Sequence, residues 1–317
     1  MISAIVFEKD KAPEVMQNIG AEKALDTLHS KKRTWVDISS GDKEALEKIL
    51  SEVFPEYHRL VLEDCLEDSK PKIEEYPKAI FCVFKTYPSG AKNYGQMSII
   101  LAKNSLITYH SKGPELEKVQ KYFSKFPAKT IDFVFYKVLD HIITGYYTEI
   151  EEYDDAINTL EKKAMERSSP RTMGHVMDIK SELLELHRIL VAERDILLML
   201  TREGDDGIVT EHTRIYLRDI YDDIMRLIDR EEMYKERLSG AIQLYLALSS
   251  NEVNEVMKKL TVLAAYVMIP MLVTGIYGMN FRYMPELSSP YGYPFAFFLM
   301  IVGIMLAHFY FKRKSIL

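Results

Sequence analysis

Two long uncharged windows near the C-terminus constrain this chain more than any other feature. Residues 260–281 and 287–311 contain no Asp, Glu, Lys or Arg. As a helix, each window is long enough to cross the roughly 30 Å hydrocarbon core of a bilayer. A buried helical hairpin in a soluble core is the alternative, but two such windows side by side are rare in soluble domains. We therefore predict two membrane spans, at about 258–280 and about 292–311, in a transmembrane hairpin of residues 254–317.

The charges around these windows predict how the hairpin is oriented. Lys258 and Lys259 precede the first window, and the basic run 312–314 follows the second. The short connection contains one residue of each sign, Arg282 and Glu286. Basic residues are retained on the cytoplasmic side of a membrane. We expect a multi-pass protein of the cell membrane with both termini in the cytoplasm and the connecting loop outside.

The sequence before residue 129 is typical of a mixed α/β domain. Short β-branched runs predict strands at residues 2–7, 34–38, 79–87, 96–102 and 105–110. Ser40 and Asp42 offer N-cap oxygens for a helix that follows, and Pro55 is expected to start another. A further helix is predicted at residues 112–125, and residues 12–30 are left unassigned. We expect a cytosolic α/β domain at residues 1–128.

Long helices dominate the chain from residue 129 onwards. Helical patterns cover residues 131–167 and 172–203, and Gly204 to Gly207 then forms a tight reversal. Residues 209–277 read as one helix, about 100 Å long at 1.5 Å per residue. Because a helix of that length is not a globular core element, we predict a cytosolic stalk at residues 129–253.

Composition and motif searches exclude several classes of function. The formal net charge of -6 argues against a nucleic-acid partner. The cysteines, Cys65 and Cys82, give neither a disulfide scaffold nor a zinc-finger spacing. The glycine-rich segment 90–97 lacks the Lys-Ser/Thr of a phosphate-binding loop, and no His-Glu-x-x-His is present. We therefore expect neither an enzyme nor an energy-coupled pump.

One face of the long helix carries a seam of polar, small and soft residues. Its members recur at alternating spacings of three and four, a period of 3.5 that keeps one face toward a common axis. They are Asn254, Met257, Leu260 or Thr261, Ala264, Met268, Met271, Gly275 and Gly278. A Met-containing helix-packing face is the alternative. The mixed character of the seam, and its continuation to Asn280, favour a pore lining. One two-span subunit cannot enclose a pore, so this interpretation requires a homo-oligomer.

The connection between the windows carries a motif. Residues 277–281 read Tyr-Gly-Met-Asn-Phe, and residues 284–287 read Met-Pro-Glu-Leu. In this position, before a second span and a basic C-terminus, the sequence resembles the CorA family of magnesium transporters. The resemblance covers the whole chain. It implies a funnel-shaped homopentamer that admits Mg²⁺ passively, with Gly278, Met279 and Asn280 as the selectivity filter. Pro270 lies one position from where the family's span proline is expected, which leaves the register around Met268 and Met271 open.

The chemistry of Mg²⁺ agrees with an asparagine ring. The ion dehydrates reluctantly and usually keeps several waters. Carboxamides of Asn280 can accept hydrogen bonds from those waters, whereas a ring of carboxylates would slow release of the ion. Gly278 would allow a close backbone approach or an unusual φ. Asn254 would form a second polar ring, and the methionines between the rings would form an apolar throat that gates by dewetting.

The resemblance also implies regulation by internal Mg²⁺. In the family, carboxylates at subunit interfaces bind Mg²⁺ and hold the closed state. The matching positions are Glu63, Asp64, Asp140 and Asp219. Mg²⁺ would then be both the transported and the regulatory ion. The alternative is solvated surface charge, of which Asp222 paired with Arg226 is the expected example.

Two other functions remain open from the sequence. One is transport of Co²⁺, Ni²⁺ or Zn²⁺, although the seam has no Cys or His for a soft-ligand zinc route. The other is a non-conducting, membrane-anchored metal sensor, which a featureless first span would favour. The expected partners are further copies of the chain, membrane lipid and divalent cations, and no nucleic acid. The sequence does not fix the ion selectivity, the number of subunits or the resting state.

Overall fold

The computed structural model of the chain describes residues 1–8, 11–30, 32–39, 42–87, 94–110, 116–166, 170–202, 207–280, 282 and 284–314. The chain divides into two compact units. The first contains Met1–Lys162 and Pro170–Gly240, and the second contains Lys163–Ser169 and Ala241–Leu317. The helix α7 (Glu211–Tyr277) begins in the first unit and ends in the second.

A seven-stranded mixed sheet organises the first unit, in the order β2-β1-β3-β7-β6-β5-β4. The strands are β1 (Ile2–Phe7), β2 (Glu14–Met16), β3 (Arg33–Ser39), β4 (Lys72–Tyr76), β5 (Ala79–Thr86), β6 (Gly95–Ala102) and β7 (Ser105–His110). The central pair β3–β7 is parallel, with Val36 opposite Ile107, and the other pairs are antiparallel. Two antiparallel groups are thus joined through a single parallel pair.

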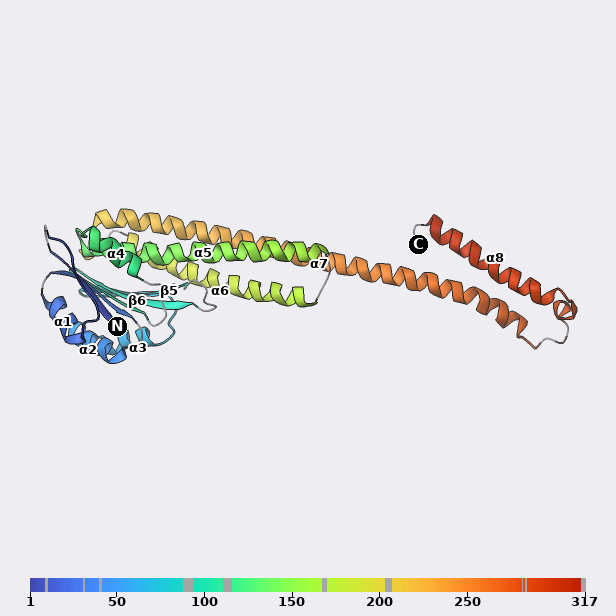
Figure 1. The fold of residues 1–317 in the computed structure, drawn as a ribbon, viewed down its shortest axis with the longest axis horizontal. Coiled ribbons are helices and arrows are strands. Elements are labelled where there is room, and N and C mark those ends of the chain that lie inside the picture. The colour runs from blue at the N-terminus through green and yellow to red at the C-terminus, as the bar shows by residue number, and fades with distance from the viewer. Residues whose placement is uncertain are drawn as a thin grey trace. The chain divides into compact units, whose positions relative to one another are not determined.

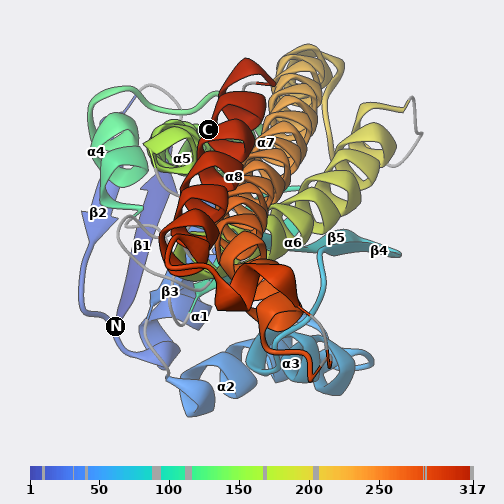
Figure 2. The ribbon, with the colours of Figure 1, turned by 90° about the vertical axis from the view of Figure 1, so that its right-hand side faces the viewer.

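Three short helices cover one face of the sheet: α1 (Ala21–His29), α2 (Lys43–Val53) and α3 (His58–Leu66). Figure 1 shows them together on one side, with the longer helices on the other. Alternate strand residues such as Val36, Ile38 and Phe81 form a buried core with these helices. On the opposite face, Phe123 of α4 (Glu117–Lys125) packs edge-on against Phe7, with ring centroids 5.8 Å apart. The result is an α/β/α sandwich, which Figure 2 shows from the end.

The long helices of this unit are α5 (Ile131–Glu166), α6 (Pro170–Thr201) and the first part of α7. Asp132 on α5 accepts hydrogen bonds from the backbone N–H and the hydroxyl of Thr210, each 2.7 Å long, and so fixes the start of α7. Further along, Arg237 of α7 contacts Asp154, Asn158 and Glu161 of α5. Polar contacts therefore join these two helices at both ends of their shared length.

These elements confirm the predicted fold class, an α/β domain followed by long helices and two C-terminal apolar helices. The Asp42 cap is confirmed, since its Oδ1 accepts from the N–H of Ala45 at 3.1 Å; Ser40 lies outside the described residues. The helix expected from Pro55 begins at His58 instead, because residues 55–57 form a turn. The unassigned segment 12–30 contains β2 and α1, and β4 was not predicted.

The helix expected at residues 112–125 is described from Glu117, and residues 111–115 lie outside the described part of the chain. The reversal at Gly204 lies outside it too, except for Gly207, whose φ is +60°. Residues 90–93 of the glycine-rich segment also lie outside, and description resumes at Tyr94. The domain boundaries at residues 128 and 253 stay a prediction.

Candidate functional site

The second unit is a helical hairpin whose surface is apolar. The later part of α7 connects through a short 3-10 helix, η1 (Pro285–Ser288), to α8 (Gly292–Arg313). Only 6% of the most apolar 18-residue window of α7 is buried, and 0% of that of α8. A soluble hairpin would bury these side chains, so their exposure fits lipid contact.

Close helix packing holds the hairpin together. The hydroxyl of Tyr266 on α7 lies 2.9 Å from Nδ1 of His308 on α8. A Cβ added at Gly303 would lie 2.6 Å from Cγ2 of Ile269, so only glycine fits there without a shift. Small residues of this kind let membrane helices approach closely. Pro270 lies inside α7, which continues through it to Tyr277.

The structure places every seam residue from Asn254 to Gly275 on α7 and leaves each of them exposed. They are Asn254, Met257, Leu260, Thr261, Ala264, Met268, Met271 and Gly275. Two open hollows lie along this face. Asn254, Met257 and Thr261 contribute to one, and Met268, Met271 and Gly275 to the other. The 3.5-residue period therefore places these side chains along one strip of α7, and neighbouring side chains such as Leu263, Val267 and Leu272 are exposed as well.

The Gly-Met-Asn motif lies directly after the end of α7. The N–H of Gly278 donates to the carbonyl of Thr274 at 2.8 Å, and that of Met279 to Ile276 at 3.2 Å, which closes the last turn. A Cβ at Gly278 would lie 3.0 Å from the Thr274 carbonyl oxygen, so the predicted close approach is observed, whereas no positive φ is found there. Asn280 is exposed, and Phe281 lies outside the described residues.

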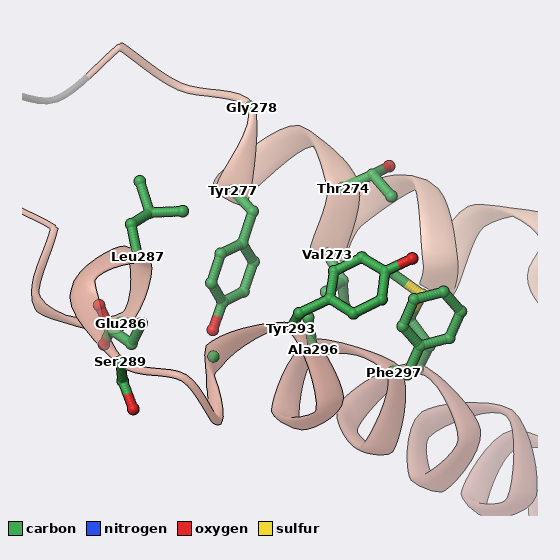
Figure 3. Close-up of a pocket in the computed structure, with 12 residues that line it drawn as sticks. Val273, Thr274, Tyr277, Gly278, Glu286, Leu287, Ser289, Tyr293, Ala296 and Phe297 are labelled. Carbon is green, nitrogen blue, oxygen red and sulfur yellow. The ribbon is translucent and has the colours of Figure 1, made fainter.

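A pocket of about 590 Å³ lies behind the motif, between the end of α7, η1 and the start of α8. Figure 3 shows Tyr277 of α7 pointing into it from one side, with Tyr293 and Phe297 of α8 on the other. Glu286 and Leu287 of η1 line its outer end. Aromatic rings of α7 and α8 therefore line the pocket next to Gly278.

The four predicted regulatory carboxylates lie in the first unit. Asp64 pairs with Lys72, Oδ2 to Nζ 2.5 Å, and Asp140 pairs with Lys137 at 3.0 Å. Glu63 and Asp219 are exposed. Within the described part of one chain, no three His, Cys, Asp or Glu side chains converge as a metal site.

The expected pair of Asp222 with Arg226 is wrong. Arg226 instead contacts Asp223, three positions before it, which also accepts a 3.0 Å hydrogen bond from the hydroxyl of Tyr147 on α5. That second contact turns the Asp223 carboxylate toward α5 and brings the guanidinium with it. Asp222 is exposed.

Three buried glutamates were missed at the sequence level: Glu149 on α5, Glu193 on α6 and Glu231 on α7, with relative exposures of 2%, 0% and 0%. The signal was present for Glu193, because it falls on the apolar stripe formed by Leu186, Leu190, Leu197 and Leu200.

An α/β domain whose last long helix runs into an exposed apolar segment, paired with a second such helix, is a membrane protein with two candidate C-terminal spans. The family described as "CorA-like Mg2+ transporter protein" matches residues 30–313. The chain therefore belongs to the CorA-like family of Mg²⁺ transporters, and it is a divalent metal ion transporter rather than an enzyme.

Individual relatives agree with this assignment. The cobalt/magnesium transport protein CorA of Thermotoga maritima is 32% identical over 304 residues, which cover 93% of this chain and 86% of that protein. The complete structure of the CorA magnesium transporter from Methanocaldococcus jannaschii superposes with a TM-score of 0.85 at 25% identity, covering 99% of this chain and 98% of that one. The full-length CmaX protein shares the fold, with a TM-score of 0.77 at 19% identity over 98% and 96% of the two chains.

Proposed function

We propose that this chain forms a passive, homopentameric channel for Mg²⁺ influx, with the exposed seam of α7 lining one central pore. One observation supports the proposal: the seam residues lie along one strip of α7, are exposed in the single chain, mix polar, small and soft side chains, and end next to Asn280. A lipid-facing strip would be uniformly apolar, whereas a strip facing water and ions carries polar groups at intervals. Several copies of α7 around an axis would cover this face.

Gly278, Met279 and Asn280 would form the selectivity filter. Asn280 is exposed at the end of α7, where its carboxamide can accept hydrogen bonds from the waters of a hydrated Mg²⁺. Gly278 keeps the last turn of α7 tight against the Thr274 carbonyl. Neutral acceptors hold the ion weakly enough for it to leave, which conduction requires.

The remaining seam residues would form the pore below the filter. Asn254 would make a second polar ring at the cytoplasmic mouth. Between the two rings, the Met257, Met268 and Met271 side chains are 55%, 65% and 64% exposed in the single chain. Placed around an axis, these flexible thioethers would narrow the path and exclude water in the closed state.

We infer that internal Mg²⁺ closes the pore through carboxylates shared between neighbouring subunits. The candidates are Glu63, Asp64, Asp140 and Asp219. The exposure of Asp219 leaves it available to a neighbour, whereas Asp64 and Asp140 each carry a lysine that the ion would have to displace or share. An ion that binds the closed state more tightly shifts the equilibrium toward it.

The proposed orientation places both termini in the cytoplasm. It is supported by Lys312 and Arg313 in the last turn of α8 and by Lys258 and Lys259 on α7, which lie at the same end of the hairpin, opposite η1. The η1 connection would then lie outside the cell.

Cobalt is the second candidate substrate, because the Thermotoga maritima and Methanocaldococcus jannaschii relatives are both described as cobalt/magnesium transport proteins. Ni²⁺ and Zn²⁺ are weaker candidates, since the seam offers no soft ligand other than methionine. A non-conducting metal sensor would not need a polar seam, so transport is favoured over it.

Uptake of Mg²⁺ into proteoliposomes with an internal fluorescent indicator tests the proposal. Asn280→Ala should abolish uptake and leave assembly intact, because the exposed carboxamide contributes no packing. Ser288→Ala, an exposed polar residue of η1, is the matched control and should transport normally. Normal uptake by a correctly inserted Asn280→Ala oligomer would exclude the filter assignment. Competition with Co²⁺, Ni²⁺ and Zn²⁺ in the same assay ranks the substrates.

A further inference from the structure

Two buried glutamates lie near the end of β5, close enough for the charge of one to act on the other. Glu149 lies on α5 and Glu193 on α6, and each leaves its Oε2 buried without a hydrogen-bond partner among the described residues. Glu193 Oε1 accepts from the backbone N–H of Lys85 at 2.7 Å. Glu149 Oε1 accepts from the hydroxyl of Tyr153 at 3.0 Å and from that of Tyr94. In both carboxyl groups, therefore, one oxygen accepts hydrogen bonds and the other has no partner among the described residues.

The hydroxyl of Tyr146 lies at the contact between Glu193 and the sheet. It lies 2.8 Å from the carbonyl oxygen of Lys85 and 3.0 Å from Glu193 Oε1. A phenol has one proton and can donate to only one of these two acceptors at a time. When it donates to the carbonyl, Glu193 Oε1 keeps one donor, the N–H of Lys85, and Oε2 has none among the described residues. The charge of a carboxylate at this buried position would therefore be poorly compensated by hydrogen bonds.

The surroundings also disfavour two negative charges. The ammonium of Lys85 acts on Glu193 but makes its ion pair with Asp68. Among the described residues, the titratable groups that face the pair are Tyr146, Glu152 and Tyr153 of α5, Lys85 of β5 with Tyr87 after it, Tyr94 before β6, and Glu182 of α6. Acids and phenols predominate among them, so an ionised pair would be buried amid like charge.

Glu231 on α7 differs from Glu149 and Glu193 because it has basic partners. It is equally buried, but Nδ1 of His187 lies 2.7 Å from its Oε2, and Nζ of Lys235 lies 3.7 Å from its Oε1. A buried carboxylate with basic partners can stay charged, whereas Glu149 and Glu193 are in contact with no basic side chain among the described residues.

We propose that Glu149 and Glu193 form a proton-operated lock, which in its neutral form holds α5 and α6 against the β5 end of the sheet and on ionisation releases them. Opening the contact would let both carboxylates reach water. Because the N–H of Lys85 is bonded to Glu193, that amide becomes accessible when the lock opens. The device belongs to the α/β domain and does not depend on the proposed pore.

The pH range over which the lock opens follows from the burial of the two carboxyl groups. Desolvation raises the pKa of Glu149 to about 7 and that of Glu193 to about 8. An acid whose pKa is raised in the closed state stabilises that state fully when the pH is below its ordinary pKa. This stabilisation is progressively lost as the pH rises through the raised pKa. Across that interval, each carboxyl group increases the opening equilibrium constant by up to about tenfold per pH unit.

Hydrogen exchange of the full-length protein in detergent tests the lock. After correction for intrinsic exchange, opening at the Lys85 amide should increase about tenfold or more between pH 6 and pH 7 in the wild type. The double variant Glu149→Gln with Glu193→Gln mimics the neutral acids and should change less than about twofold. Glu185→Gln, an exposed acid of α6, is the control and should behave as the wild type. Equal pH dependence in the wild type and the double variant would overturn the proposal.

Infrared spectroscopy of the wild type keeps the test decisive if the double variant fails to fold. A buried neutral carboxyl group gives a C=O stretch that is distinct from that of a carboxylate. The band should be present near pH 6 and lost above about pH 9. Glu149→Gln alone should remove part of it. If the band is missing near pH 6, both groups are ionised and the lock does not exist.

Discussion

Arg237 joins α7 to α5 by the most concentrated set of polar contacts on the long helices, and its removal gives a prediction with a calculable size. Its guanidinium lies 2.6 Å from Asp154 Oδ1 and 2.8 Å from Asn158 Oδ1, and its two contacts with the Glu161 carboxylate measure 2.9 and 3.3 Å. The hydrogen bond to Glu161 is the largest cause of a raised pKa of Arg237. A planar fork matched to a carboxylate in this way is a geometry that lysine cannot reproduce.

We estimate the loss from how exposed the cluster is. The Arg237 side chain is 30% exposed and its acidic partners 41% and 35%, so solvent screens the ion pairs substantially. Exposed pairs contribute about 0.2–1 kcal/mol each, and charge-assisted hydrogen bonds about 1.5–3 kcal/mol when buried. Two partly screened pairs and one amide contact then stabilise the α5–α7 contact by about 2 kcal/mol. That corresponds to a roughly 30-fold change in local opening.

Hydrogen exchange of α5 peptides covering residues 151–162 measures this change. Arg237→Ala should increase local opening about 30-fold at low salt and by less at high salt. The opening of Arg237→Lys should lie between that of the wild type and that of Arg237→Ala. Arg218→Ala is the matched control, because Arg218 lies on the same helix and its ion pair, with Glu211, lies within that helix. If the two alanine variants exchange alike, or if lysine restores full protection, the fork does not hold the helices together.

Three shorter predictions concern the proposed regulation, topology and packing. Asp219→Asn should shift Mg²⁺ protection against proteolysis to higher Mg²⁺, whereas Asp222→Asn, equally exposed on the same helix, should not; identical curves for Asp219→Asn and the wild type would exclude Asp219 as a ligand. Cysteine at Ser288 should react with an impermeant reagent on intact cells, and cysteine at Ser239 only after permeabilisation; the reverse pattern would invert the topology. Gly303→Val should lower hairpin stability by about 1–3 kcal/mol, and an unchanged melting temperature in detergent would show that α7 and α8 do not pack there.

The sequence predicts the apolar helices and most strands because these elements are fixed by local composition. A bilayer requires long uncharged windows, and the buried strands are runs of β-branched and aromatic residues. The predicted strand at residues 105–110 has the bounds of β7. The edge strand β4 escaped prediction because its Lys-Ile-Glu-Glu-Tyr sequence is polar, and its pairing with β5 depends on backbone hydrogen bonds.

Side-chain partners were harder to predict because they depend on contacts distant in sequence. The spacing of Arg226 permits a pair with Asp222 or Asp223, and Tyr147 of α5 decides between them. The burial of Glu193 is set by β5, more than a hundred positions earlier in the chain. The position of the seam residues along one strip of α7, by contrast, follows from a helical period, which is a local property, and the role of this strip as a pore lining stays a prediction.

The single parallel pair in the sheet has a consequence for how the protein forms during synthesis. The group β2-β1-β3 is complete once Ser39 has left the ribosome, but its partner strand β7 begins only at Ser105. At typical elongation rates the intervening residues take roughly 3–13 s to appear. During that interval the β3 edge displays unpaired N–H and C=O groups, a template for pairing with other nascent chains. We expect this nascent edge to be a point of chaperone dependence, and slower translation before residue 105 to increase aggregation.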